Sequence, residues 1–185
     1  MTAEHDTFRA MGPAEYAREC VESMVRRRPT PAAPGGEVFA PRAACFVSIK
    51  KLGELRGCVG TLAPAEPDLA HEIARNAASA AFHDPRFHAV GEDELAALTY
   101  SVDVLSPSEP ATAAELDPSE YGVIVTAGFR RGVLLPDLTG VDTVARQLAI
   151  ALQKAGISPD EEFAIERFTV KRYHEGTDQS GGCAQ

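Results

Sequence analysis

The sequence predicts an α+β fold in which helices flank a largely antiparallel sheet. Segments with strand-like character come in pairs joined by short turns, whereas parallel strands need a longer crossover, usually a helix. The segments between these pairs include stretches with apolar residues at helical spacing. Hydrophobic residues make up 44% of the 185 residues and charged residues 24%, which is the composition of a globular protein with a core of its own.

The first element is expected to be a helix over residues 13–28. Ala17 and Val21 belong to one apolar stripe at helical spacing, and Pro13 suits the first turn of a helix. The proline- and glycine-rich segment that follows, up to residue 41, predicts a loop.

A hairpin and a second helix are expected next. Residues 43–51 are apolar on both faces, which indicates a central strand, and residues 54–60 form the returning strand. Asp68 is a suitable N-cap for the second helix, which Pro85 brings to an end.

The C-terminal half predicts further strands and one more helix. Alternating residues, turn residues and capping residues set the expected bounds. In chain order we expect a strand at 98–106, a loop at 106–120, two strands within 121–138 that turn near Gly128, a helix over 142–155 with Asp142 as its cap and Gly156 at its end, and a last strand at 163–173.

Composition excludes several classes of protein. The net charge of −9 would repel a phosphate backbone, so we expect no nucleic-acid partner. No apolar run is long enough to cross a membrane, and the N-terminus lacks the apolar core of a signal peptide. The four cysteines have no CxxC spacing, which predicts free thiols in a reducing cytoplasm. The polar ends, 1–12 and 175–185, are expected to be flexible.

The segment ELRGCVG, residues 54–60, is the first candidate site. Strict alternation in a strand would place Arg56 and Cys58 on one face, with Leu55 and Val59 towards the core. A guanidinium beside a thiol favours the reactive thiolate, and Gly57 leaves room for a ligand. Cys58 is equally readable as a small packing residue in a strand, and both interpretations stay open.

The segment FHDPRFH, residues 82–88, is the second candidate site. Asp84 and Arg86 are expected to face the same way, either as a salt bridge at the helix end or as a grip for a carboxylate or phosphate. His83 and His88 add groups that can carry protons. Because His83, Asp84 and His88 lack a standard ligand spacing, no metal site is predicted.

LRGCVG (55–60) together with AAFHDPRF (80–87) resembles the AMMECR-type domain family, the protein A component of the AmmeMemoRadiSam system. The segments SVDVLSPSEP, GVLLPDL and ALQKAGISPDE add to the resemblance, which covers about residues 13–174 as a single domain of two subdomains. YGVIV and LLPDL depart from the family's usual pattern, which puts ligand contacts from those loops in doubt.

The resemblance implies two unequal lobes with a cleft between them, and as partners a Memo-like protein and a radical-SAM protein. It supports two hypotheses. In the first, the protein is an enzyme with Cys58 as nucleophile or proton donor and His83 or His88 as proton shuttle, while Arg56, Gly57, Asp84 and Arg86 bind an anionic small molecule or a peptide. In the second, it is a non-catalytic partner of the same system. The sequence names no cofactor.

Overall fold

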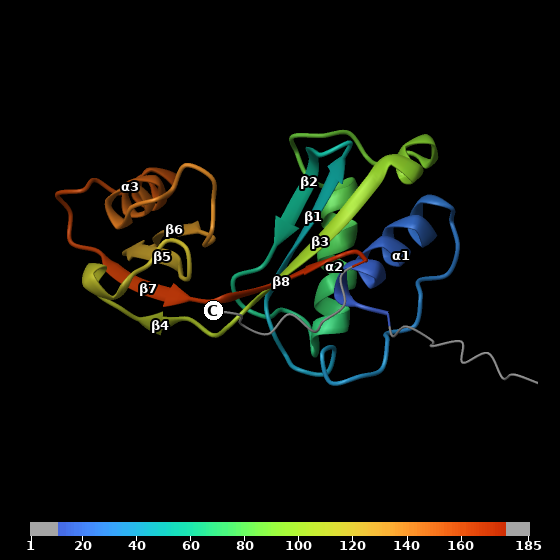
Figure 1. The fold of residues 1–185 in the computed structure, drawn as a ribbon, viewed down its shortest axis with the longest axis horizontal. Coiled ribbons are helices and arrows are strands. Elements are labelled where there is room, and N and C mark those ends of the chain that lie inside the picture. The colour runs from blue at the N-terminus through green and yellow to red at the C-terminus, as the bar shows by residue number, and fades with distance from the viewer. Residues whose placement is uncertain (1–10, 177–185) are drawn as a thin grey trace, which may run out of the picture. The chain divides into compact units, whose positions relative to one another are not determined.

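The computed structural model describes residues 11–176, and its elements follow the α+β expectation (Figure 1). The α-helices in this range are α1 (Pro13–Val25), α2 (Leu69–Phe82) and α3 (Val144–Ala155). The 3₁₀ helices are η1 (Glu92–Ala97) and η2 (Ala113–Glu115). The strands are β1 (Cys45–Lys51), β2 (Glu54–Gly60), β3 (Leu98–Leu105), β4 (Glu109–Pro110), β5 (Gly122–Ala127), β6 (Arg130–Leu134), β7 (Ala164–Phe168) and β8 (Val170–His174).

The strands form two four-stranded antiparallel sheets, ordered β2-β1-β3-β8 and β4-β7-β5-β6. The described residues divide correspondingly into two compact units, one of residues 11–103 and 172–176 and the other of residues 104–171. The sequence predicted the antiparallel hairpins correctly but did not separate the strands into two sheets.

In the first unit, two helices cover one face of the sheet. Helix α2 packs on β1 and β2, and α1 packs on α2 (Figure 1). Val47 and Ile49 of β1 are fully buried on this face, together with Ile73 and Ala77 of α2. Alternation along the strands leaves the second face to more polar side chains, such as Ser48.

The second unit has its own hydrophobic core between its sheet and helix α3. Val123 and Val125 of β5 are fully buried there, and Ala151 and Leu152 of α3 pack against them. Gly132 allows α3 to approach the sheet, because a Cβ at this position would lie 2.0 Å from the carbonyl oxygen of Ala151. Each unit therefore buries its own set of apolar side chains between its sheet and its helices.

Most predicted bounds are confirmed, but the cap of α3 is not. Asp68 caps α2 as expected, since its side chain accepts a hydrogen bond from the backbone N–H of His71. Helix α3 is capped by Thr143, whose hydroxyl accepts from the N–H of Arg146, so the assignment of Asp142 was wrong by one residue. Gly156 ends α3 with φ of 65°, a conformation that favours glycine.

The last predicted strand is in fact two strands in different sheets. Residues 164–168 form β7 beside β5, and residues 170–174 form β8 beside β3. Thr169 separates them. Its N–H donates to the hydroxyl of Ser106, directly after β3, and its carbonyl oxygen accepts from the Ser106 N–H. The uninterrupted apolar and polar pattern gave no sign of this break. Two 3₁₀ helices, at 92–97 and 113–115, were also missed.

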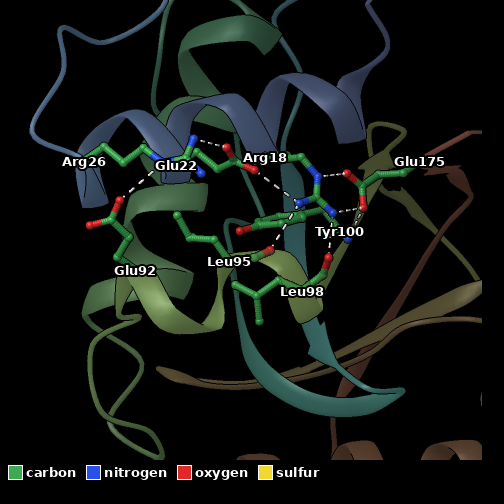
Figure 2. Close-up of polar contacts among 8 residues, drawn as sticks. All are labelled: Arg18, Glu22, Arg26, Glu92, Leu95, Leu98, Tyr100 and Glu175. Atoms are coloured by element: carbon green, nitrogen blue, oxygen red, sulfur yellow. Dashed lines mark hydrogen bonds and ion pairs between the residues drawn. The ribbon is translucent and has the colours of Figure 1, made fainter.

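The predictions for the chain ends fall mostly outside the described residues, as does Cys183. Glu175, which was assigned to the flexible C-terminal segment, is instead held in place by Arg18 and by the N–H of Tyr100 (Figure 2). None of the helices in the described part of the chain is both long and apolar enough to cross a membrane.

Candidate functional site

Cys58 lies on β2, an edge strand of the first unit's sheet, and its side chain points away from helix α2. Gly57 defines this orientation, because a Cβ on Gly57 would lie 2.2 Å from the carbonyl oxygen of Ala80 in α2. Only glycine permits so close a contact between strand and helix. The neighbouring Cys58 side chain is therefore on the opposite, more polar face, where it is partly buried.

Ser48 is the cross-strand neighbour of Cys58. The two residues are paired between β1 and β2, and the Ser48 hydroxyl donates a hydrogen bond to the Cys58 sulfur at 3.2 Å. The backbone N–H and C=O of Cys58 point away from β1, which makes this a non-hydrogen-bonded pair, the type whose side chains lie closest. The Ser48 hydroxyl can therefore donate a hydrogen bond to a negatively charged sulfur.

Asp84 and Arg86 bind the outward-facing backbone of Cys58. Asp84 Oδ2 accepts from the Cys58 N–H at 2.9 Å, and Arg86 Nη2 donates to the Cys58 carbonyl oxygen at 3.2 Å. The two side chains also form a two-point ion pair with distances of 2.9 and 2.7 Å. The predicted pairing of Asp84 with Arg86 is therefore present, and it fixes the position of Cys58.

The side chains of Asp84 and Arg86 differ sharply in solvent exposure. The Asp84 side chain is 3% exposed, whereas that of Arg86 is 54% exposed. The hydrogen bond from Arg86 lowers the pKa of Asp84 far below its usual range, although burial opposes the shift. The pKa of Arg86 is raised, mainly by its hydrogen bond to Asp84, and Cys58 adds an electrostatic contribution. The hydrogen bond from Arg86 Nη2 to the Cys58 carbonyl oxygen thus holds a cation beside the cysteine.

Arg56 does not follow the alternation that the sequence suggested. Ile49 pairs with Gly57 but Lys50 pairs with Leu55, so Arg56 is an extra residue in a β-bulge. Leu55 is consequently 43% exposed, and its predicted place in the core was wrong. The bulge also removes the basis for placing Arg56 and Cys58 on one face.

Glu94 of η1 binds the Arg56 guanidinium. Arg56 Nε and Nη2 donate to the two carboxylate oxygens at 3.0 and 2.8 Å, and Lys51 Nζ donates to one of them at 2.9 Å. The hydrogen bond to Arg56 is the main reason that the pKa of Glu94 is lowered to about 2. Arg56 Nη1 is buried without a hydrogen-bond partner among the described residues.

Phe87 connects the two arginines of the site. Its ring centroid lies 5.9 Å from Cζ of Arg56 and 5.5 Å from Cζ of Arg86, within the range of cation–π contacts. The segment 84–87 therefore contacts both of the residues singled out in the LRGC segment.

The predicted histidines lie at the edge of this cluster. His83 is the exposed C-cap residue of α2, directly before Asp84, and His88 is also exposed. Neither imidazole ring forms a hydrogen bond to another of the described residues that would test a role in proton transfer. Within residues 11–176, no group of three or more His, Cys, Asp or Glu side chains could hold a metal ion.

Three contributors were missed at the sequence level. Ser48 follows from the register of the hairpin, which its two-residue turn could have indicated. Glu94 lies in an unrecognised 3₁₀ helix 38 residues from Arg56, so no local pattern could have found it. Glu72 is fully buried, and its carboxylate accepts hydrogen bonds from the N–H groups of Ala65 and Glu66, which fixes the loop after β2.

The other described cysteines are packing residues. Cys20 and Cys45 are fully buried, and burial raises their pKa values to about 11 and about 12. Cys58 alone of these three is partly exposed, and none of the three forms a disulfide.

Comparison with known proteins decides the family. The AMMECR1 family model matches residues 14–176, which includes both units and the whole site. The chain belongs to the AMMECR1 family. This confirms the resemblance that the LRGC and DPRF segments carried.

The relatives of this chain include proteins of Thermotoga maritima and Clostridium acetobutylicum. The chain is 55% identical over 140 residues to a protein of Thermotoga maritima, covering 74% of this chain and 80% of that protein. It is 55% identical over 130 residues to protein CA_C1420 of Clostridium acetobutylicum, covering 70% of this chain but 28% of that protein. In the Clostridium protein, the matching region is thus a small part of a much longer chain.

A solved structure supports the AMMECR1 fold. The crystal structure of the uncharacterized protein PH0010 from Pyrococcus horikoshii superimposes with a TM-score of 0.81 at 25% sequence identity. The match covers 90% of this chain and 91% of the other, so the architecture of both units is shared.

Proposed function

We propose that this AMMECR1-family protein is an enzyme that acts on a small molecule or peptide through the thiol of Cys58. The observation that carries the proposal is the environment of Cys58: its thiol is partly exposed and accepts a hydrogen bond from Ser48, and its carbonyl oxygen accepts one from the Arg86 guanidinium. A hydroxyl donor and a nearby guanidinium both stabilise negative charge on sulfur, and the thiolate is the nucleophilic form.

The remaining residues have supporting roles in this proposal. Asp84 positions Arg86 and the Cys58 backbone, and Gly57 seats the strand on α2. Arg56 is bound to Glu94, so its role is to hold the bulge that precedes Cys58. His83 is the titratable residue beside Asp84 and is the candidate proton shuttle.

Alkylation with iodoacetamide, followed by mass spectrometry of the peptides, tests the proposal. At neutral pH, Cys58 of the folded protein should react faster than the same residue in the protein unfolded in urea. Ser48→Ala and Arg86→Gln should each slow the reaction severalfold, because each removes a group that stabilises the thiolate. Cys20 and Cys45 serve as internal controls, since both are buried and should stay unmodified until the protein unfolds.

Two results would end the nucleophile proposal. One is a Cys58 that reacts more slowly in the folded protein than in the unfolded one. The other is a reaction rate that neither Ser48→Ala nor Arg86→Gln changes, because the environment of the sulfur would then have no chemical effect. The role of His83 is tested separately by measuring how the alkylation rate of Cys58 depends on pH in His83→Ala, where a changed pH dependence is expected.

The second candidate function is a partner protein for the Memo-like and radical-SAM components. Leu52 is 84% exposed at the turn between β1 and β2, and Leu55 is 43% exposed on the same hairpin. Exposed apolar side chains close together are typical of contact surfaces. The length of CA_C1420 supports the same idea, because there the homologous region shares one chain with a large additional segment.

Copurification tests this second candidate. Under it, a complex with the Memo-like or radical-SAM protein should form at micromolar concentration, and Leu52→Asp should weaken it. Phe129→Asp is the control, because Phe129 is 97% exposed on the turn between β5 and β6 in the other unit. Equal loss in both variants, or no complex at all, would count against an adaptor role.

A further inference from the structure

A hollow of about 170 Å³ lies on the first unit beside the polar face of its sheet. Its walls come from three elements and the segment after β8, and they consist of Lys50, Thr99, Tyr100, Ser101, His174 and Glu175. This volume is several times the ~30 Å³ that one water molecule occupies in the liquid. The hollow therefore has room for a small polar group.

The backbone register relates this hollow to Cys58. The N–H of Leu52 donates to the carbonyl oxygen of Ala97, which pairs the strands so that Ser48 faces Ser101. This register agrees with the Ser48–Cys58 pair. In an inner antiparallel strand, the N–H and C=O of a residue both point to the same neighbouring strand, and those of Ser48 point to β3 and not to β2. Cys58, Ser48 and Ser101 therefore stand in one row across β2, β1 and β3.

The row continues onto the last strand. Asp103 and Arg172 form a two-point ion pair across β3 and β8, and Ser106 N–H bonds to the carbonyl oxygen of Thr169. This register places His174 opposite Ser101. Since strands lie ~4.8 Å apart, Ser101 is two strand spacings, or about 10 Å, from Cys58.

The groups that line the hollow favour an anion. Lys50 is exposed and supplies a positive charge, while Thr99 and Ser101 supply hydroxyl donors. The carboxylate of Glu175 is already bound, since it accepts hydrogen bonds from the Arg18 guanidinium and from the N–H of Tyr100 (Figure 2). Arg18 also stacks over the Tyr100 ring at 4.9 Å, which keeps this neutralising charge in place.

We propose that this hollow binds the carboxylate or phosphate group of the molecule on which Cys58 acts. The proposal rests on the proposed function, and it adds a substrate class to it. The hollow at Ser101 lies about 10 Å, or two strand spacings, from Cys58, so the anionic group of the substrate is separated from the part that meets the sulfur by roughly three extended peptide units. A substrate with an acid group directly beside its electrophilic atom would not reach both places.

The test is a titration of the ¹⁵N-labelled full chain with inorganic phosphate and, separately, with sodium acetate, followed by NMR. Saturable shifts are expected at the amides of Lys50, Thr99 and Ser101, and the better of the two anions identifies the group. Lys50→Gln should weaken binding about tenfold, because it removes a charge-assisted hydrogen bond. Ser101→Ala should weaken it less.

Lys51→Gln is the matched control. It removes the same charge from the adjacent residue, but Lys51 is bonded to Glu94 and does not line the hollow. Binding should survive in Lys51→Gln, and sodium chloride at equal ionic strength should not reproduce the shifts. Shifts that do not saturate, that chloride reproduces, or that both lysine variants lose equally would overturn the proposal.

A Cys58→Ser variant separates this proposal from the proposed function. The variant keeps the hollow but lacks the thiol, so phosphate or acetate should bind to it as to the unsubstituted protein. If Cys58 proves unreactive while the anion still binds at Lys50, the nucleophile is wrong and the anion site stands. If Cys58 is reactive and neither anion binds, the hollow is not the substrate's anion site.

Discussion

At the scale of single residues, close contacts leave little freedom around Cys58. Gly57 touches helix α2, Asp84 binds the Cys58 backbone, and Ser48 contacts the sulfur. Each of these residues makes specific contacts that fix its position, and a substitution acts through those contacts.

Gly57→Ala should destabilise the protein by about 1–3 kcal/mol, because the new methyl group would lie 2.2 Å from the Ala80 carbonyl oxygen and would push α2 from the sheet. The control is Gly35→Ala, where the new methyl group meets nothing within 4 Å. That variant should be neutral or slightly stabilising. Urea unfolding of both variants gives the comparison, and equal stabilities would contradict the packing argument.

Glu94 should make folding stability depend on pH in the acid range. Its pKa falls to about 2 in the folded protein, first through the hydrogen bond to Arg56, compared with about 4.3 in an unfolded chain. A lowered folded-state pKa contributes stability above the unfolded value, and this contribution is lost as pH falls from about 4.3 towards 2.

Urea unfolding at several pH values measures this effect. The unsubstituted protein should be more stable than Glu94→Gln at neutral pH, and the difference should shrink as the pH falls below about 4. A difference that stays constant down to pH 2 would show that the Arg56–Glu94 pair does not titrate as argued.

At the scale of elements, β2 is an edge strand whose exposed backbone is protected by side chains. Unpaired N–H and C=O groups on an edge invite pairing with another chain. Asp84 and Arg86 occupy both groups of Cys58, as the backbone of a further strand would. The segment after α2 thus has a structural role that holds whichever function Cys58 has.

Helix α3 provides a sharp test at this scale, because the expected and observed caps are neighbours. Thr143→Ala should cost about 1 kcal/mol, since it removes the hydroxyl that accepts from the Arg146 N–H. Asp142→Ala should change stability by less than about 0.5 kcal/mol, since Asp142 is exposed and does not cap the helix. Thermal unfolding of the two variants should rank them in this order.

At the scale of the whole molecule, the chain builds two units that each have a sheet and a core. The boundaries fall after Asp103 in β3 and before Arg172 in β8. The Asp103–Arg172 ion pair joins these two strands within the first unit. Every residue of the candidate site and of the hollow proposed to bind an anion belongs to that unit, so both proposals concern the first unit alone.

The sequence by itself determined the local elements and the family. The bounds of β2, the Asp68 cap and the Gly156 end of α3 were predictable because each depends on residues a few positions apart. The LRGC and DPRF segments identified the family in the same way, and they indicated Cys58, Asp84 and Arg86 as neighbours in a site.

Only the tertiary structure decided what surrounds the sulfur. A bulge of one residue breaks the period of two at Arg56, so the contact with Glu94 could not follow from alternation. The division of the last strand between two sheets likewise depends on Ser106, 63 residues from Thr169. Such contacts form because strands that are distant in the sequence pair in space. The stability of such a pairing depends on residues of both strands and of their neighbours, so it cannot be predicted from one local segment.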